Sequence, residues 1–399
     1  MDAMSLPALP LPREWELPFD PPPSPAPAGS RVVEVACPTG LTAWLVSDYA
    51  GVREVLGDGR RFSARPGQAS HMLSAFDPTS EPDGFSRMDG PEHVRIRRNF
   101  APQVSHARRL GELKPLVEEI TDRAITRMLA SPQPFPLHAA FSTAITTEVI
   151  AELIGVPPAQ RHLLRNAAQA LFTTTTTASS LEAALSPLFG YLYQAVASRR
   201  AAPGDDVLSR MILQGDGSDR PLTDAELVDM NAALLIAGFD TTASMITFGL
   251  VALLNTPGEW DKLVADPALA VPATEELVRY LGVGTGLLRQ ATEDTSLGDQ
   301  EIRAGDYVVV SVQAGNRDTA LYPDAEILDI ARKPGPHIGF GHGAHACVGQ
   351  QVARMELNTV LAALATRVPA LRTAVPVSEI EWKRDSVVRG PVELPVTWS

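Results

Sequence analysis

The sequence predicts a mainly α fold with small β-sheets, an α+β class, and three observations support this. The longest helical pattern covers residues 224–254, which is roughly 45 Å at the rise of an α-helix. It is apolar on nearly every side, so we expect it to run buried through the middle of the molecule. Apolar residues also recur at helical spacing over residues 110–154. Strand character is confined to short stretches such as 31–35 and 41–46, which flank a Pro-Thr-Gly turn.

The amino-acid composition limits the classes of protein to which the chain can belong. The chain has 399 residues, of which 45% are hydrophobic and 20% charged, as in a large globular protein with an ample core. Its net charge of −13 argues against a nucleic-acid binder, which needs a basic face. The two cysteines, Cys37 and Cys347, make no disulfide framework, so we expect a reducing cytoplasm. Cys37 lies at the strand turn and is expected to be a structural thiol.

We expect no membrane span and no signal peptide. No apolar run approaches the roughly 18 residues that cross a bilayer, and the N-terminus lacks the basic-then-apolar layout of a secretory signal. Residues 1–30 are rich in proline and are expected to form an extended N-terminal segment. This leaves residues 31–399 for the folded part, although length alone would allow two or three domains.

A glycine-rich loop carries the second cysteine. Residues 340–349 contain glycines that let the backbone turn tightly and approach a flat ligand, and a helical pattern follows at 348–368. The unpaired N–H groups and the positive dipole end at the start of this helix are expected to lower the pKa of the Cys347 thiol. A thiolate there would suit a soft metal. The alternative is an inert, buried cysteine in an ordinary loop.

The loop resembles the cysteine-ligand loop of the cytochrome P450 family, Phe-Gly-x-Gly-x-His-x-Cys-x-Gly. Every fixed position is matched, by Phe340, Gly341, Gly343, His345, Cys347 and Gly349. The resemblance implies the P450 fold, with haem b (iron protoporphyrin IX) between the long central helix and this loop, and residues 31–399 as one catalytic domain. It further implies that Cys347 is the axial ligand of the haem iron, whose electron donation favours O–O cleavage.

A polar run interrupts the long apolar helix at residues 237–242. A buried carboxylate costs several kcal/mol unless it is paired or used, so Asp240 needs an explanation. A hydroxyl can bond back to the carbonyl four residues earlier, which accounts for Thr242 but not for Asp240. Gly238 weakens the helix and would allow a ligand to approach closely. The run resembles the family's oxygen-activating motif, which implies that Thr241 hydrogen-bonds dioxygen and that Asp240 relays protons.

Two further runs resemble the family's haem-propionate contacts. His93 and Arg97 lie four residues apart in a helix that begins near Pro91, so they share a face, although either could be a solvated surface residue. The run is similar to the family's Pro-Glu-His-x-Arg-x-Arg-Arg helix. Arg289 begins a segment similar to the Arg-x-Ala-x-Glu-Asp strand. The resemblance implies that His93, Arg97, Arg289 and His345 bind the two propionates, which is sensible chemistry for carboxylates.

A structural triad is also implied by the resemblance. Glu276 and Arg279 form a Glu-x-x-Arg pair on a predicted helix, which alone is weak evidence because helix surfaces carry many such pairs. In the family this pair is buried and joined by an arginine of a later irregular segment, which Arg332 matches here.

The substrate pocket is expected to be apolar. Residues 63–89 form a long irregular segment, which is typical of functional or mobile loops. Five threonines at 173–177 interrupt a helical pattern, which fits either a mobile lid or a polar surface linker. The tip of the closing hairpin either reaches the cavity or is an exposed turn. The candidate pocket residues are Met72, Phe76, Phe85, Leu171, Phe172, Leu235, Phe239, Val283, Leu287, Leu288 and Val387.

The implied function is a monooxygenase that places one oxygen atom of O₂ into a lipophilic or mixed-polarity substrate, by hydroxylation or epoxidation. The alanine-, arginine- and proline-rich chain resembles bacterial members that tailor secondary metabolites. No flavin or iron–sulfur motif is present, so a ferredoxin and its reductase are the expected electron donors, with NAD(P)H acting only through them. We expect a monomer whose docking patch for the ferredoxin draws on Arg98, Arg108, Arg109 and Arg354.

Three other functions compete with that of a monooxygenase. A peroxide-driven relative would lack the acid–alcohol pair, which this chain keeps as Asp240 and Thr241. A non-enzymatic haem-thiolate sensor would carry an effector domain, for which we expect no room in this length. A degenerate accessory protein would be expected to lose Cys347 or Thr241, and both are present.

Overall fold

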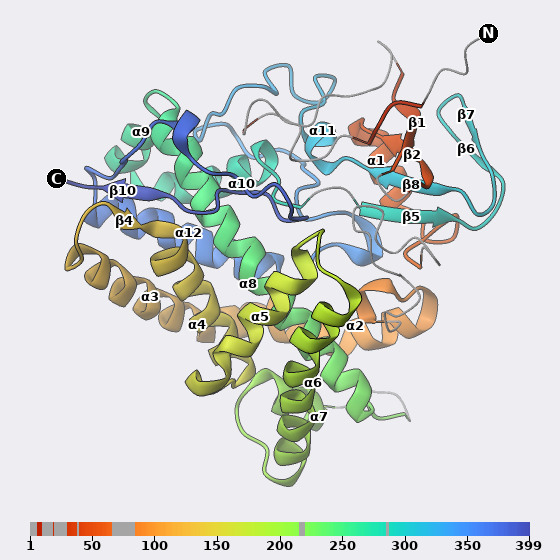
Figure 1. Cartoon of the computed structure of the whole chain (residues 1–399), viewed down its shortest axis with the longest axis horizontal. Helices are drawn as coiled ribbons and strands as arrows, with labels where there is room; N and C mark the ends of the chain where they lie inside the picture. Colours follow the sequence, from red (N-terminus) through yellow and green to blue (C-terminus); the bar gives the residue numbers. More distant parts are fainter. Residues whose placement is uncertain are drawn as a thin grey trace.

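Helices dominate the computed structural model, which describes residues 6–9, 19, 30–37, 40–65, 84–214, 220–284 and 287–399 (Figure 1). The helices are α1 (Tyr49–Gly57), α2 (Gly90–Ser105), α3 (Ala107–Leu129), α4 (Thr143–Ile154), α5 (Arg161–Phe172), α6 (Ala178–Ala201), α7 (Val207–Gln214), α8 (Asp224–Asn255), α9 (Glu259–Ala265), α10 (Ala270–Tyr280), α11 (Val312–Asn316) and α12 (Gln350–Arg367). Short 3₁₀ or π turns include η4 (Phe85–Arg87), η5 (His138–Ser142) and η8 (Gly343–His345).

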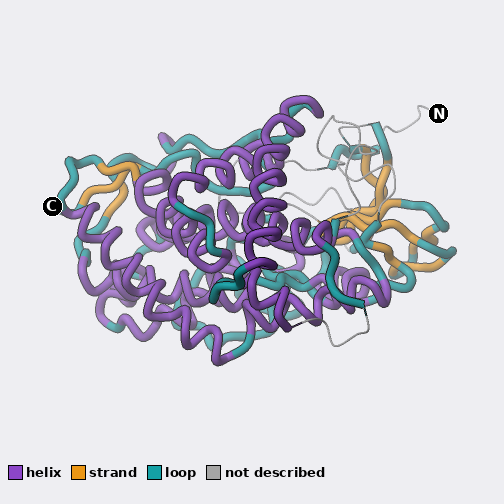
Figure 2. Tube along the Cα trace, turned by 90° about the horizontal axis from the view of Figure 1, so that it is seen from below, coloured by secondary structure: helices purple, strands orange, loops and turns teal. Residues whose placement is uncertain are grey.

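The strands form three small sheets. They are β1 (Val32–Ala36), β2 (Thr42–Val46), β3 (Phe62–Ser63), β4 (Phe135–Pro136), β5 (Leu287–Ala291), β6 (Thr295–Leu297), β7 (Gln300–Ile302), β8 (Tyr307–Val310), β9 (Arg372–Thr373) and β10 (Pro395–Thr397). The largest sheet has the order β1-β2-β8-β5-β3, with only β2 and β8 parallel. Sheet β4-β10-β9 lies near the C-terminus, at the opposite end of the helical block (Figure 2). The expected fold class is confirmed.

Helix α8 forms the centre of the core. Its N-terminus is closed by a reciprocal capping box between Thr223 and Glu226, as the Thr-x-x-Glu spacing allows. From Leu227 to Leu253 most of its side chains are buried, and it packs against α4, α5, α6 and α12. The predicted range 224–254 differs from the observed helix by one residue.

The expectation that no apolar run approaches the length of a membrane span was wrong for this helix. Asp224–Asn255 is long and apolar enough to cross a bilayer by length and composition, and the pair His138–Ile154 and Pro158–Phe172 also passes this test together, bent by 119°. In α8, however, 78% of the most apolar window is buried inside the protein. A core helix that is apolar all round has this property because neighbouring helices cover every face.

The helical pattern predicted over 110–154 is interrupted. Helix α3 ends at Leu129, and β4, the π turn η5 and then α4 follow. The prolines Pro132, Pro134 and Pro136 explain the break, since proline lacks the N–H that a helix interior requires and also restricts the residue before it. The five threonines, in contrast, separate α5 from α6 as predicted.

Candidate active site

The cysteine loop is shaped by glycines that no other residue could replace. Gly341 and Gly343 have φ angles of 74° and 72°, in the left-handed region that favours glycine. A Cβ on Gly343 would lie 2.3 Å from the carbonyl oxygen of Leu56, at the end of α1. The backbone N–H of Cys347 donates to the carbonyl of Phe340 at 2.7 Å. The loop therefore packs directly on α1.

The pKa of the Cys347 thiol is raised, so the expected direction of its shift was wrong. Desolvation by the surrounding protein is the largest effect, and the opposing hydrogen bonds from the N–H groups of Gly349 and Gln350 and the charges of Arg97 and Arg354 are smaller. The residue is nevertheless exposed, so a ligand can reach the sulfur. A coordinated metal removes the proton from such a thiol.

Phe340 is fixed by a charged cluster on the other side of the loop. The guanidinium of Arg354 lies 4.3 Å from the centre of the Phe340 ring, and it donates to both oxygens of Glu275 at 2.6 and 3.0 Å. Glu275 also bonds His337 at 2.9 Å. Although burial raises the pKa of Glu275, these hydrogen bonds and charges lower it to about 2. Arg354 is thus paired within the protein, with 22% of its side chain exposed.

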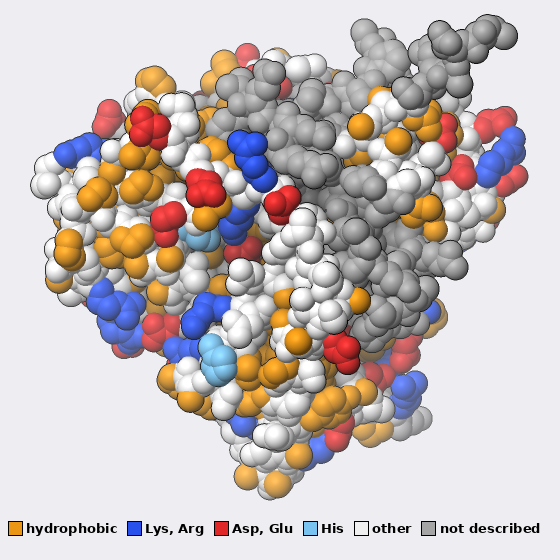
Figure 3. Space-filling view, viewed as in Figure 1, with side chains coloured by type: hydrophobic (Ala, Val, Ile, Leu, Met, Phe, Trp, Pro, Cys, Tyr) orange, Lys and Arg blue, Asp and Glu red, His pale blue; other side chains and the backbone are white. Residues whose placement is uncertain are grey.

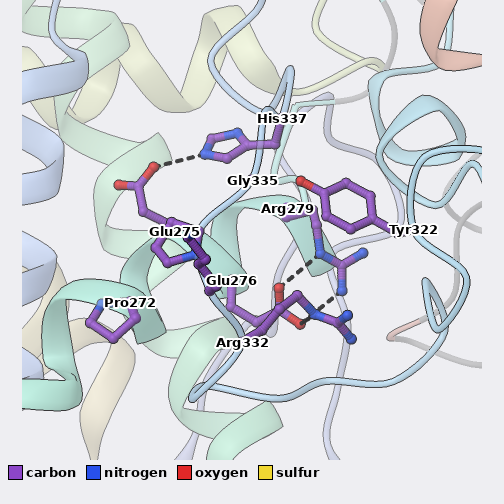
Figure 4. A pocket seen from close by; sticks show the side chains of 10 residues that line it. Pro272, Glu275, Glu276, Arg279, Tyr322, Arg332, Gly335 and His337 are labelled. Carbon is purple, nitrogen blue, oxygen red and sulfur yellow. Dashed lines mark hydrogen bonds and ion pairs between the residues drawn. The ribbon is translucent and has the colours of Figure 1, made fainter.

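Below this cluster lies the predicted triad. Arg279 donates from two nitrogens to the two oxygens of Glu276, both at 2.8 Å, and Arg332 donates to Glu276 at 3.1 Å. Figure 4 shows the three side chains together, with Glu275 and His337 beside them. Arg279 also donates to the carbonyls of Asn316 and Ala325. The triad therefore joins α10 to the irregular segment before the cysteine loop.

Four basic side chains converge beside the cysteine loop. The rings of His93 and His345 are stacked, with centroids 4.1 Å apart, and Arg97 donates to the carbonyl of Ala346. Burial, followed by the charges of His93, Arg289 and Arg97, lowers the pKa of His345 to about 4. Arg289 lies in β5 and is 7% exposed. These residues come from α2, β5 and the loop itself.

This cluster lacks the anions that would balance it. Within the described part of the chain, neither Arg97 nor Arg289 has an ion pair within 4 Å, and burial lowers the pKa of both. The Nε2 atom of buried His93 has no hydrogen-bond partner there. The nearest carboxylate, Asp89, is 3.7 Å from His345 and already accepts from Ala64. Buried cations and an orphaned ring nitrogen fit a ligand with carboxylate groups, because unpaired buried charge is costly.

One face of α8 is open where the rest of the helix is buried. Ala237 is exposed, and Gly238 and Thr241 are half-buried. The Thr241 hydroxyl donates to the carbonyl of Ala237 at 2.5 Å, so the back-bonding that we expected at Thr242 is made by Thr241. The missing Cβ of Gly238 faces α4, where it would lie 3.2 Å from Ile150. Helix packing is therefore one reason for a glycine at this position.

Asp240 points to a different side of α8. Successive helix residues are about 100° apart, and the Asp240 carboxylate meets the ammonium of Lys383, 3.0 Å from one oxygen and 3.3 Å from the other. Lys383 comes from the C-terminal segment, 143 residues away in the sequence. Sequence reasoning missed this partner because no local spacing links the two positions.

The pocket candidates fall into three groups. Leu235, Phe239 and Phe85 are 0%, 6% and 6% exposed and belong to the main core cluster. The partly or fully exposed candidates are Leu171, Phe172, Val283, Leu287, Leu288 and Val387. Met72 and Phe76 lie outside the described residues.

These accessible candidates do not all face the same way. Leu287 points toward the cysteine loop, since a Cβ on Gly341 would lie 4.0 Å from it. Leu288, its neighbour in β5, packs against the core on the other face of the sheet, as alternation in a strand requires. The N–H of Val387 donates to the carbonyl of Phe172 at 2.9 Å. The hairpin tip thus contacts the end of α5, beside the threonine break.

Comparisons with known proteins match both the sequence and the shape. The family model for cytochrome P450 matches residues 148–367. The mycinamicin IV hydroxylase/epoxidase of Micromonospora griseorubida is 38% identical over 374 residues, 92% of each chain. The nocardicin C N-oxygenase of Nocardia uniformis is 37% identical over 379 residues, 94% of each chain. The crystal structure of CYP105P1 in complex with filipin I superposes with a TM-score of 0.92 at 37% identity and covers 99% of both chains.

The chain belongs to the cytochrome P450 family. It is a P450 monooxygenase that carries haem b, uses O₂ and receives electrons from redox partners. The residues of this P450 fit that cofactor on their own chemistry: a reachable cysteine sulfur, an apolar face on α8, and a basic cluster that lacks its anions. The long helix (224–255) and the cysteine loop (340–349) come from separate stretches of the sequence.

Proposed function

We propose that this P450 oxidises a lipophilic or mixed-polarity bacterial secondary metabolite, by hydroxylation or epoxidation. The relatives support the class of substrate, because their names describe oxidation of mycinamicin IV and nocardicin C. The accessible side chains near the cysteine loop and the α5 end are apolar, including Phe172, Val283 and Leu287. Such a lining binds ligands mainly by burial of apolar surface and leaves selectivity to a few polar groups.

Haem b is proposed to be held by Cys347 as the axial ligand and by His93, Arg97, Arg289 and His345 at its carboxylates. The cofactor supplies oxygen activation, which thiolate donation favours. Phe340, Gly341 and Gly349 would shield the sulfur and let the loop approach the cofactor. The unbalanced charge of the basic cluster is the single observation that carries this assignment.

Thr241 and Asp240 are proposed as the catalytic pair. Thr241 places a hydroxyl on the open face of α8, where it holds a proton on Oγ1. Asp240 takes up a proton from solvent on its carboxylate and passes it toward this face, as a general acid–base group does. The pair also separates this P450 from a peroxide-driven enzyme, which needs no proton route for dioxygen.

The redox partner is proposed to be a ferredoxin with its reductase, so that NAD(P)H acts indirectly. Of the four arginines expected at the docking surface, Arg108 and Arg109 both pair with Glu112 and Arg354 pairs with Glu275. Arg98, which is exposed on α2, remains a candidate. On the face drawn in Figure 3, cationic and anionic side chains are interspersed, with no patch of a single sign.

We further propose that residues 31–399 act as one catalytic domain, that residues 1–30 are an extension of it, and that the protein is a cytoplasmic monomer. Contacts of the N-terminal segment support the proposal that residues 1–30 are an extension of this domain. Pro7 and Leu9 form backbone hydrogen bonds with Ala36 and extend the edge of β1.

Turnover with ¹⁸O₂ tests the proposed reaction. Metabolites are first screened for the optical shift from low-spin to high-spin haem, and positive compounds are then incubated with a ferredoxin, its reductase and NADPH. We expect the product to gain one labelled oxygen atom. Unlabelled product, or product formed only when hydrogen peroxide is added, would reject the monooxygenase reaction for that substrate.

Substitution of Thr241 tests the catalytic pair. Thr241→Ala should bind haem and substrate normally, because the side chain only bonds its own helix, but it should divert most electrons to hydrogen peroxide. Thr241→Ser keeps the hydroxyl and serves as the control, with coupling close to the parent protein. Full coupling in Thr241→Ala would remove the role of this hydroxyl.

A further inference from the structure

The ion pair between Asp240 and Lys383 has a geometry that uses the whole ammonium group. Lys383 donates to both oxygens of Asp240, at 3.0 and 3.3 Å, and to the hydroxyl of Ser244 at 2.9 Å. An ammonium has three donors, so all three are satisfied. The side chains of Lys383 and Asp240 are 16% and 17% exposed. The pair is therefore largely buried but remains within reach of water.

A row of polar groups continues from this pair along α8. Asp240, Ser244 and Thr247 are spaced four and three residues apart, so they share one face of the helix. The Nδ1 atom of His138 lies 2.9 Å from the hydroxyl of Thr247, which also bonds Ser142 at 2.9 Å. Ser244, Thr247 and Ser142 are fully buried. On a helix that is otherwise apolar, such a row needs partners that the C-terminal segment and η5 supply.

The charge of Lys383 compensates the charge of Asp240. A carboxylate in this apolar setting would be costly without a counter-ion, and removing one partner of a buried pair leaves the other charge uncompensated. The contact with both oxygens also fixes the direction of the carboxylate, which points toward the C-terminal segment and not toward Thr241. Lys383 thus compensates the charge and fixes the orientation of the proposed proton-relay group.

We propose that Lys383 is the positioning residue of the proton-relay acid, and that protons enter this site beside residues 382–390. When Asp240 binds a proton from water, its carboxylate becomes a neutral carboxyl and its attraction to Lys383, which stays an ammonium, is lost. The carboxyl can then turn toward the open face of α8. Release of the proton restores the anion and the pair. This inference rests on the proposed role of Asp240.

Infrared spectra of the resting, substrate-free protein test the positioning role of Lys383 without any turnover. The C=O stretch of a protonated aspartic acid is compared in the parent, Lys383→Gln, Lys383→Arg and the double variant Lys383→Gln/Asp240→Asn near neutral pH. We expect an acid band in Lys383→Gln that is missing in the parent and in the double variant. Lys383→Arg keeps the positive charge and should lack the band. Lys114→Gln, which removes an exposed ammonium on α3, is the matched control and should resemble the parent.

The share of electrons released as hydrogen peroxide supplies the second measurement. Lys383→Gln should raise this share of electrons several-fold, whereas Lys383→Arg should give a share close to the parent value. The double variant should release the same share as Asp240→Asn, because both changes act through one group. If Asp240→Asn stays coupled, the role of Asp240 fails and this inference fails with it. If Asp240→Asn is uncoupled while Lys383→Gln is coupled and shows no acid band, only the inference is overturned.

A second variant keeps the test decisive if Lys383→Gln does not fold. Ser244→Val removes one of the three acceptors of the ammonium and leaves its charge in place. A rise in peroxide above the parent value supports the positioning role, whereas peroxide at the parent level overturns it.

Discussion

Several residues of the site would lower the stability of the folded protein if no ligand were bound. The Nε2 atom of His93 is buried without a partner among the described residues. Arg289 is a buried cation whose one hydrogen bond within the described part of the chain goes to the carbonyl of Leu288. Each group would lower the stability of a protein that had no further use for it. At Gly343 the constraint is steric, because the backbone of α1 occupies the place of a side chain.

Gly343→Ala tests that steric constraint. The added Cβ would clash with the Leu56 carbonyl and with the Cα of Gly57, 3.0 Å away, in a backbone conformation that alanine avoids. We expect a loss of about 2 kcal/mol or more of unfolding free energy and a lower haem content of the purified protein.

Gly349→Ala is the matched control in the same loop. Nothing lies within 4 Å of a Cβ at this position, and its φ of −84° suits any residue. Its unfolding free energy should stay within about 0.5 kcal/mol of the parent value. Equal stability of the two variants would contradict the packing of the loop on α1.

At the scale of elements, α8 combines two different faces on one apolar helix. Thr241 lies on the open face, and Asp240 lies on the polar row that the C-terminal segment covers. Because neighbouring residues differ by about 100° in direction, adjacent positions can serve a reaction site and a buried ion pair at once. The π turn η5 completes the row by placing His138 against Thr247.

His138 makes stability depend on pH. Burial and the charge of Lys383 lower its pKa from 6.5 to about 4, against weaker opposing effects of Asp240 and Glu393. Between these values the unfolded chain binds a proton that the folded chain does not, so unfolding free energy falls as pH drops from about 6.5 to 4. The loss attributable to this histidine is about 3 kcal/mol.

Chemical denaturation at a series of pH values measures this effect. His138→Asn should flatten the slope over the same interval, and His162→Asn, at the exposed start of α5, should not. An unchanged slope in His138→Asn would show that the histidine is not held neutral by the fold.

Sequence reasoning placed the elements that have local signals. The apolar pattern of α8 and the glycines of the cysteine loop were visible in the sequence because their causes lie within a few residues. The partners Lys383 and Glu275 were missed because their contacts join segments far apart in the chain. The direction of the Cys347 pKa was also missed, since helix dipoles are local whereas desolvation depends on every surrounding element.

For the whole molecule, the triad connects the helical block to the irregular segment that leads into the cysteine loop. Glu276 bonds Arg279 on its own helix and Arg332 on that segment, and Arg279 reaches further backbone carbonyls there, as Figure 4 shows for the side chains. The side chains of Glu276 and Arg279 are 3% and 2% exposed. The segment that leads into the cysteine loop is therefore held by a buried ion pair.

Glu276→Gln should destabilise the protein by about 3–5 kcal/mol, because two buried or half-buried guanidinium groups lose their counter-ion. The haem content of the purified protein should fall together with its stability. The control Glu118→Gln breaks an exposed pair with Lys114 and should cost no more than about 0.5 kcal/mol. Denaturant unfolding of the two variants side by side measures the difference, and a similar small loss in both would mean that the triad does not hold the segment.

The carbon monoxide difference spectrum of the reduced protein tests the central claim, that the sulfur of Cys347 holds the haem iron. The parent protein is expected to give the red-shifted absorption band of a thiolate ligand, and Cys347→Ser is expected to lose it, while Cys37→Ser, which removes the buried thiol at the strand turn, keeps it. A parent spectrum typical of an imidazole ligand, or a red-shifted band that survives in Cys347→Ser, would contradict the account.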